Sequence, residues 1–373
     1  MTKLFVMVGT NPIPCYISAL YLLNYYSSDK ELYLVCSKDD PSINQAGTYP
    51  VGERIQDQVK VLFPNLQIFL KEISDVASSN AITAVLQDCY NTEDEVHLNY
   101  TGGTKSMAAI AFNMLKGHPY FSSSYLDGRR HIMIMDGEIP DSADLRTDAG
   151  LRLNLETIIR LHGLDDFAEN PINPGYRGLM DEIGKWLTSK RINELYCSRN
   201  HQKTPPEKLL EEEKQVGQKR EKLITASGIR DHESNEKRIN EFIDGKWLER
   251  YLFEKLNITE HQGVDIYFDV EKDNYCQLDL IAIYGYQMTL ISVTTDSHQA
   301  MSKLKAFEAI HRAHQLGGDE AKTIMVTFIK DPRNLEANIR GSFGSLVPGF
   351  KAYGINDFYD DSIFSKIIKY IKE

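Results

Sequence analysis

The sequence predicts an α/β protein with a doubly wound parallel sheet, a helical connector and a second α/β domain. Three observations lead to this fold. Residues 1–135 alternate short apolar stretches with amphipathic ones, the pattern of strands covered on both faces by crossover helices. Residues 151–240 are mostly polar with helical spacing, and three apolar stretches follow one another after residue 240. We therefore expect a first domain at 1–150, a mostly helical connector at 151–240 and a last domain at 241–373.

The first domain is expected to alternate strands with helices and to close with a hairpin. Ligands of such sheets bind beyond the carboxyl ends of the strands, and the segments 9–11 and 101–105 follow the first and fourth strands. The predicted strands are 4–9, 31–37, 65–73, 95–100, 123–128 and 131–137, and the predicted helices are 15–26, 52–63, 78–90 and 105–116.

The segment NYTGGTKSM, residues 99–107, is the most informative part of the chain. It follows an apolar stretch and runs directly into AAIAFNML, which has the pattern of a helix. Backbone N–H groups at a helix N-terminus lack intrahelical partners, and the helix dipole there favours negative charge. Gly102 and Gly103 let the backbone approach a ligand, and Lys105 adds a positive charge. The segment predicts a phosphate site, with an ordinary turn between a core strand and a core helix as the alternative.

The last domain is expected to follow the order α-β-β-β-α-β. Its first helix, 245–256, places apolar residues on one face. This order of elements is that of the PD-(D/E)xK nuclease core. The predicted strands are 265–272, 276–285, 288–295 and 322–329, and the later helices are 298–316 and 362–371.

Composition excludes several classes of protein. The 373 residues carry a net charge of −11, so the chain has no overall basic field for nucleic acid. It has no uninterrupted apolar run long enough for a membrane span. The five cysteines are scattered without paired spacing, which is typical of a reduced, cytoplasmic protein. We therefore expect a cytoplasmic protein with no membrane partner.

Both halves resemble one family. The N-terminal half is similar to the CRISPR-associated Rossmann-fold (CARF) sensors through VMVGTNPIP (6–14), NYTGGTKSMAAIAF (99–112) and LETIIRLHGL (155–164). The C-terminal half resembles the PD-(D/E)xK domain of these proteins through GKWLERYL (245–252) and QLDLIAIY (277–284). This resemblance implies an ancillary effector of type III CRISPR antiviral defence.

The resemblance also implies a ligand and an assembly. The family binds cyclic oligoadenylates, with cyclic tetraadenylate the expected ring, across the two-fold axis of a homodimer. Helix N-termini and lysines from both chains would then neutralise the phosphates. The matching positions, which we expect to bind the ligand, are Gly9, Thr10, Asn11, Thr101, Gly102, Gly103, Thr104 and Lys105.

The nuclease resemblance departs from the family at its third motif. Such a site needs carboxylates for Mg²⁺ or Mn²⁺ and usually a lysine. Glu249 and Asp279 match two ligand positions, but Ser292-Val293-Thr294 stands where the family has Glu-x-Lys. Neither hydroxyl replaces a carboxylate or a lysine charge. Taken alone, this motif indicates a decayed nuclease.

A migrated active site is the alternative to decay. Glu308 on the following helix would complete the metal ligands with Glu249 and Asp279, and Lys305 projects from the same helical face as Glu308.

The ordinary interpretation of the same helix makes Lys305 and Glu308 an exposed ion pair. In that case Leu304, Phe307, Ile310 and Leu316 would face the core.

Three outputs follow from the resemblance. In the first, the last domain cuts DNA or RNA, single-stranded nucleic acid included, with Mn²⁺ or Mg²⁺ as cofactor. In the second, it is an inert nuclease fold that binds a protein partner. In the third, the sensor cleaves its own bound ring as a ring nuclease, and the sequence does not decide between these three functions.

Overall fold

The computed structural model describes residues 1–41, 46–139, 144–164, 167–169, 174–196, 206–229, 232–259, 263–272, 276–343, 349–360 and 362–373. The chain forms two compact units, which are described separately below. The first consists of Met1–Phe167, Ile283–Met288 and His314–Ala321, and the second of Ala168–Ala282, Thr289–Ala313 and Lys322–Glu373. The proposed division into three domains stays a prediction.

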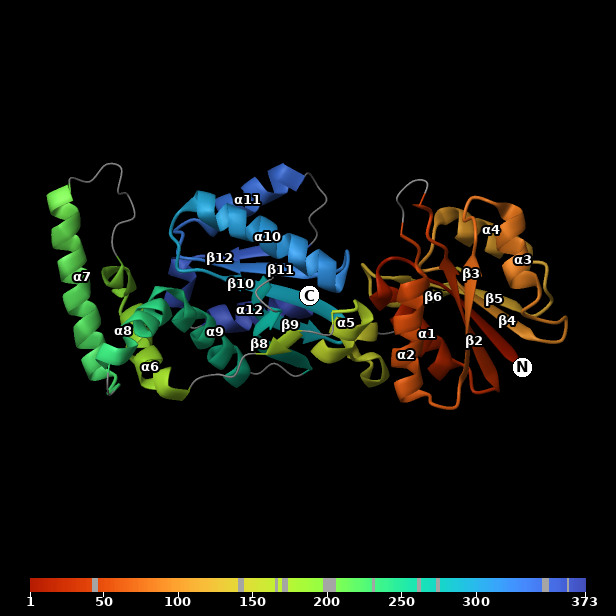
Figure 1. The fold of residues 1–373 in the computed structure, drawn as a ribbon, viewed down its shortest axis with the longest axis horizontal. Helices are drawn as coiled ribbons and strands as arrows, with labels where there is room; N and C mark the ends of the chain where they lie inside the picture. Colours follow the sequence, from red (N-terminus) through yellow and green to blue (C-terminus); the bar gives the residue numbers. More distant parts are fainter. Residues whose placement is uncertain are drawn as a thin grey trace. The chain divides into compact units, whose positions relative to one another are not determined.

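The first unit contains a six-stranded sheet in the order β3-β2-β1-β4-β5-β6. The first five strands pair in parallel, and β6 runs antiparallel to β5. The predicted alternation of strands and helices with a closing hairpin is confirmed (Figure 1). The strands are β1 (Thr2–Met7), β2 (Lys30–Ser37), β3 (Gln67–Ile73), β4 (Glu95–Asn99), β5 (Phe121–Asp127) and β6 (Ile132–Met135).

Helices cover both faces of this sheet. Phe5, Met7 and Leu98 pack on one face with residues of α3 and α4, and α1 and α2 contact β1 and β2 on the other. Because both faces are buried, the central strands are apolar throughout instead of alternating. The helices are α1 (Pro12–Tyr25), α2 (Tyr49–Leu62), α3 (Ser79–Gln87), α4 (Lys105–Leu115) and α5 (Leu155–Leu161).

The strand order reverses between β1 and β4. The chain moves from β1 outward through β2 to β3, and then returns to β4 on the other side of β1. Such a reversal opens a crevice at the carboxyl ends of the two central strands, where open α/β sheets bind ligands. The segments that follow β1 and β4 are the two that the sequence analysis singled out.

The turns after β1 and β4 pack directly against each other. A Cβ atom on Gly102 would lie 2.4 Å from the Met7 carbonyl oxygen and 2.6 Å from the Gly9 amide nitrogen. Gly103 has φ of +76°, a backbone conformation that favours glycine. Both glycines are therefore needed for the backbone of this junction itself, whatever ligand it takes.

The second unit contains a six-stranded sheet in the order β12-β11-β10-β9-β8-β7. Strands β10, β11 and β12 pair in parallel, and the two-residue turn between β9 and β10 makes these neighbours an antiparallel hairpin. The strands are β7 (Phe167–Glu169), β8 (Val264–Lys272), β9 (Cys276–Tyr284), β10 (Gln287–Val293), β11 (Lys322–Val326) and β12 (Phe350–Tyr353).

The expected α-β-β-β-α-β order is present as α9, β8, β9, β10, α10 and β11. The π-helical turn Phe242–Lys246 leads into α9, where Trp247 is fully buried and its indole N–H donates to the Tyr196 hydroxyl at 2.7 Å. The helices are α6 (Arg177–Thr188), α7 (Pro206–Ala226), α8 (His232–Glu241), α9 (Trp247–Ile258), α10 (Gln299–Gly317), α11 (Pro332–Phe343) and α12 (Ser362–Lys372).

Two further expectations concerned reduced cysteines and the absence of a membrane span. Cys15, Cys36 and Cys89 are buried free thiols, whereas Cys197 lies outside the described residues. Among the helices that the structure describes, none combines the length and apolar character needed to cross a bilayer.

We predict that Gly102→Ala destabilises the first unit, because the added methyl group would overlap the backbone of the β1 turn. Overpacking of this kind costs about 1–3 kcal/mol of unfolding free energy. Urea denaturation followed by circular dichroism measures it. Gly117→Ala is the matched control, since its Cβ would meet no atom within 4 Å, and its unfolding curve should superimpose on that of the unmodified protein. Equal stability of both variants would contradict the close packing.

Candidate functional site

A cavity of about 390 Å³ lies in the first unit at the carboxyl ends of β1 and β4. The structure thus brings together two turns that are about ninety residues apart in the sequence. The expected binding residues that line it are Gly9, Thr10, Asn11, Thr101, Gly102 and Gly103.

Two helices begin at this cavity. The Asn11 side chain caps α1 by accepting a hydrogen bond from the Ile13 amide at 3.1 Å. Thr104 caps α4 by accepting from the Met107 amide at 3.2 Å. The cap of α4 leaves other first-turn N–H groups at the positive end of the helix dipole. Helix α1 differs, because Pro12 and Pro14 have no N–H and the Ile13 amide is taken by Asn11. The start of α4, with the glycine turn before it, is therefore the part of this site suited to an anion.

The other two expected residues have different positions. Thr104 and Lys105 do not line the cavity. Thr104 is the helix cap, and Lys105 is the first residue of α4, with an exposed side chain. Lys105 is therefore an exposed cation at the start of α4, outside the cavity lining.

A buried polar network fixes the turn after β4. Asn99 accepts a hydrogen bond from the Thr101 amide at 3.2 Å and donates to the Ser124 hydroxyl at 2.9 Å. His97 bonds to Ser122 and Ser124, both at 2.7 Å. Burial lowers the pKa of His97 to about 4, so this imidazole is neutral at physiological pH. The network sets the direction of the turn and does not supply charge.

Thr101 has a positioning role in the same turn. Its hydroxyl accepts a hydrogen bond from the Leu126 amide at 2.8 Å and lies 3.2 Å from the Ser18 hydroxyl. These bonds tie the end of β4 to β5 and α1.

The opposite wall of the cavity comes from the second half of the sequence. It is formed by the turn between β9 and β10 and by the residues that follow α10, both of which belong to the first unit. The sequence analysis did not predict this wall. The missed residues include Tyr286, Gln287, Gly317, Asp319 and Glu320.

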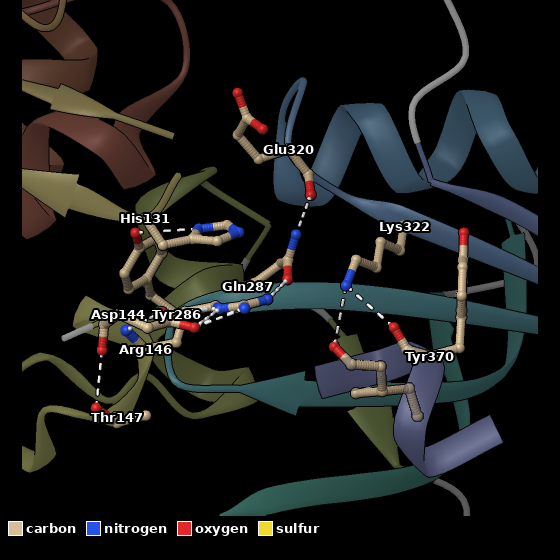
Figure 2. A network of polar contacts seen from close by, with 10 residues as sticks. His131, Asp144, Arg146, Thr147, Tyr286, Gln287, Glu320, Lys322 and Tyr370 are labelled. Atoms are coloured by element: carbon tan, nitrogen blue, oxygen red, sulfur yellow. Dashed lines mark hydrogen bonds and ion pairs between the residues drawn. The ribbon is translucent and has the colours of Figure 1, made fainter. Parts of the chain in front are cut away.

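Gln287 holds this wall in place (Figure 2). Its side-chain N–H donates to the Glu320 carbonyl at 2.8 Å, and its oxygen accepts from the Arg146 guanidinium at 2.5 Å. Arg146 is buried and forms an ion pair with Asp144 at 2.6 Å. Next to Gln287, the Tyr286 hydroxyl lies 3.3 Å from His131 Nδ1. Gln287 therefore links the turn to the residues after α10 and to Arg146.

A second cavity of about 220 Å³ lies in the second unit. Asp279 and Ser292 line it from β9 and β10, and Lys305, Glu308 and Arg312 line it from α10. This arrangement places three residues of the expected migrated site, Asp279, Lys305 and Glu308, around one cavity, without Glu249. Lys305 and Glu308 are exposed, as the ordinary interpretation expects. In the described structure, Lys305 and Glu308 form no ion pair with each other.

The core face of α10 differs from the ordinary interpretation at one residue. Ile310 and Leu316 are buried as expected, but Leu304 is 62% exposed.

Two acidic side chains next to this cavity are buried together. Asp279 accepts hydrogen bonds from the Val293 amide at 2.6 Å and from the Ser292 hydroxyl at 3.3 Å. Glu249 does not line the cavity, and its Oε2 atom is buried with no hydrogen-bond partner among the described residues. Burial raises the pKa of both carboxyl groups, and for Glu249 the charge of Asp279 adds to the effect. A cation nearby would relieve this strain.

The described residues gather two carboxylates, not three, around the second cavity. Across the described residues, no three His, Cys, Asp or Glu side chains form a group that could hold a metal ion. Glu249, Asp279 and Glu308 are thus not gathered as a set of three. Mg²⁺, however, commonly binds through one or two carboxylates and completes its shell with water and substrate phosphates. Asp279 and Glu308 satisfy that requirement in one cavity.

Two solved structures share the fold of this chain over its whole length. One is Can2 from Sulfobacillus thermosulfidooxidans in complex with cyclic tetra-adenylate, with 13% identity and a TM-score of 0.69 over 100% of this chain and 99% of that chain. The other is protein VC1899 from Vibrio cholerae, with 12% identity and a TM-score of 0.66 over 100% of this chain and 98% of that chain.

No protein-family model and no curated protein matches this sequence. At 12–13% identity, the structural matches show a shared fold and nothing beyond it. The expected resemblance to CARF-domain proteins is confirmed at that level, and the chain has the two-sheet α/β fold of Can2 from end to end.

Proposed function

We propose that this chain is a receptor for cyclic oligoadenylates, cyclic tetraadenylate in particular, in type III CRISPR antiviral defence. The observation that carries the proposal is the cavity where β1 and β4 end, lined by segment 9–11 and by segment 101–103. The likeness of fold to Can2, whose structure holds cyclic tetra-adenylate, supports the same ligand.

The chemistry of the cavity suits phosphodiester groups. The N-terminus of α4 and the glycine backbone before it present N–H donors, which bind phosphate without reading a base. Lys105 follows directly as an exposed cation that can reach a phosphate from outside the cavity. A cyclic ligand with its own symmetry would be bound by two copies of this site, so we propose a homodimer with one ring between two chains.

We predict that Lys105→Gln weakens binding of cyclic tetraadenylate roughly fivefold to tenfold, because each chain loses one exposed phosphate ion pair. Isothermal titration calorimetry of the full-length protein measures the dissociation constant and the number of rings per chain. The salt dependence of binding should also become shallower.

Lys116→Gln is the matched control, since Lys116 caps the opposite end of the same helix and is also exposed. Its affinity should equal that of the unmodified protein. Equal loss in both variants would mean that overall charge, not the α4 N-terminus, attracts the ligand. A failure of the unmodified protein to bind any cyclic oligoadenylate would contradict the proposed function.

We further propose that the second cavity is a metal-dependent nuclease site under the control of this ligand. Asp279 and Glu308 would hold Mg²⁺ or Mn²⁺, and Ser292 would keep Asp279 oriented through its hydrogen bond. The bound cation would supply a nucleophilic water and neutralise phosphate charge. Lys305, across the same cavity, would place its ammonium group beside the scissile phosphate of DNA or RNA.

Two elements contribute residues to both cavities, which supports control by the ligand. Helix α10 places Lys305 and Glu308 in the second cavity and ends at Gly317 in the first. The β9–β10 hairpin places Asp279 in the second cavity and Gln287 in the first. A ligand in the first cavity that shifts the ends of α10 and of the β9–β10 hairpin would therefore also move the residues of these elements in the second cavity. This requires that the ligand binds the shifted conformation with a different affinity from the unshifted one.

We predict that ring-stimulated cutting of labelled single-stranded nucleic acid in Mn²⁺ falls at least about 100-fold in Asp279→Asn and in Glu308→Gln, because each removes a cation ligand or its charge. Lys305→Ala should also reduce the rate. Lys303→Ala is the control, because Lys303 lies over the Phe307 ring and outside the cavity.

Loss of cutting in Asp279→Asn with full activity in Glu308→Gln would contradict the migrated site. If the domain is inert, the unmodified protein should bind the ring and cut nothing with any metal, and that result would favour a binding module for a protein partner.

A further inference from the structure

The two walls of the first cavity offer opposite hydrogen-bonding groups. The wall at the ends of β1 and β4 presents backbone N–H donors of the glycine turn that leads into α4. The wall after α10 presents the carboxylates of Asp319 and Glu320, which accept hydrogen bonds and carry negative charge. A phosphate group is repelled by the second wall, so a ligand that fills the cavity must turn a hydrogen-bond donor toward it.

The Glu320 side chain has a defined position in this wall. A Cβ atom on Gly128 would lie 2.8 Å from the Glu320 Oε1 atom, so the carboxyl group lies against the backbone of the turn between β5 and β6. The Glu320 carbonyl is held by Gln287, which is held in turn by buried Arg146. Figure 2 shows the carboxyl group pointing away from this clamp. Gly128 leaves the space that the carboxyl group occupies.

Glu320 is also available to a ligand. Within the described part of the chain, its carboxylate accepts no hydrogen bond and forms no ion pair. Its neighbour Asp319 differs, because it lies 3.6 Å from His314 and its side chain is 99% exposed. The Gln287 amide is already used on both sides. The half-buried Glu320 carboxylate is therefore the acceptor that this wall offers to a bound molecule.

We infer that Glu320 accepts a hydrogen bond from the exocyclic 6-amino group of an adenine and so selects adenine in the ring. The inference rests on the proposed function and adds the residue that reads the base. An adenine amino group is an uncharged donor, whereas guanine places an acceptor oxygen at that position, which the carboxylate repels. The phosphates of the same nucleotide would face the N–H donors of the opposite wall.

The test compares two rings that differ by the amino group alone. Cyclic tetraadenylate is measured against the cyclic tetranucleotide of purine riboside, which keeps every phosphate and ribose hydroxyl. The unmodified protein should prefer the adenosine ring roughly tenfold or more, the effect of a hydrogen bond to a charged acceptor. Glu320→Ala should lose this preference by weakening the adenosine ring alone. Glu320→Gln should keep part of it, because its amide oxygen still accepts.

Glu93→Ala is the matched control, since it removes an exposed glutamate next to the amino end of β4, away from the cavity. It should keep the full preference. An unchanged preference in Glu320→Ala would overturn the inference, and so would tighter binding of both rings by the same factor, because the carboxylate would then only repel phosphate. A failure of the unmodified protein to bind either ring would instead overturn the proposed function, and the inference with it.

Discussion

The close backbone approach of the turns after β1 and β4 is the constraint on which the rest of the candidate site depends. Gly102 has no room for a side chain against the Met7 carbonyl and the Gly9 amide. This packing brings the turns that lead into α1 and α4 to one cavity. Because the strand order reverses between β1 and β4, no helix crosses in front of the cavity. The proposed anion site is thus a consequence of backbone geometry, and side chains such as Asn99 and Thr101 hold the turn in place.

The second constraint is that elements of the C-terminal half complete the cavity. The β9–β10 turn and the residues after α10 belong to the same compact unit as the N-terminal sheet. Arg146, buried beside Asp144, fixes Gln287, and Gln287 fixes the backbone at Glu320. A ligand in this cavity would contact the ends of the two elements that carry Asp279 and Glu308. Under the proposed function, no further element is needed to connect ligand binding in the first cavity with the second cavity, because α10 and the β9–β10 hairpin contribute residues to both.

Local patterns predicted most elements and one wall of the cavity. The glycine turn, its strand and its helix lie within fifteen residues, so NYTGGTKSM was sufficient to locate them. The other wall was not predictable, because Gln287 and Glu320 come from an ordinary hairpin turn and a helix end whose partners lie far away in the sequence. Helix α11 and strand β12 were also missed, the latter because it spans only Phe350–Tyr353. The cavity that gathers Asp279, Lys305 and Glu308 agrees with the spacing on α10, whereas the burial of Glu249 outside it depends on tertiary packing.

Hydrogen–deuterium exchange of the full-length protein with and without cyclic tetraadenylate tests the central claim most directly. The account predicts slower amide exchange in both walls at once, in segments 9–11 and 101–104 and in segments 286–287 and 317–320. This pattern follows because one ligand would contact backbone from both halves of the chain. Protection confined to the N-terminal segments, or no protection in any of the four, would contradict a single ligand cavity built from both halves.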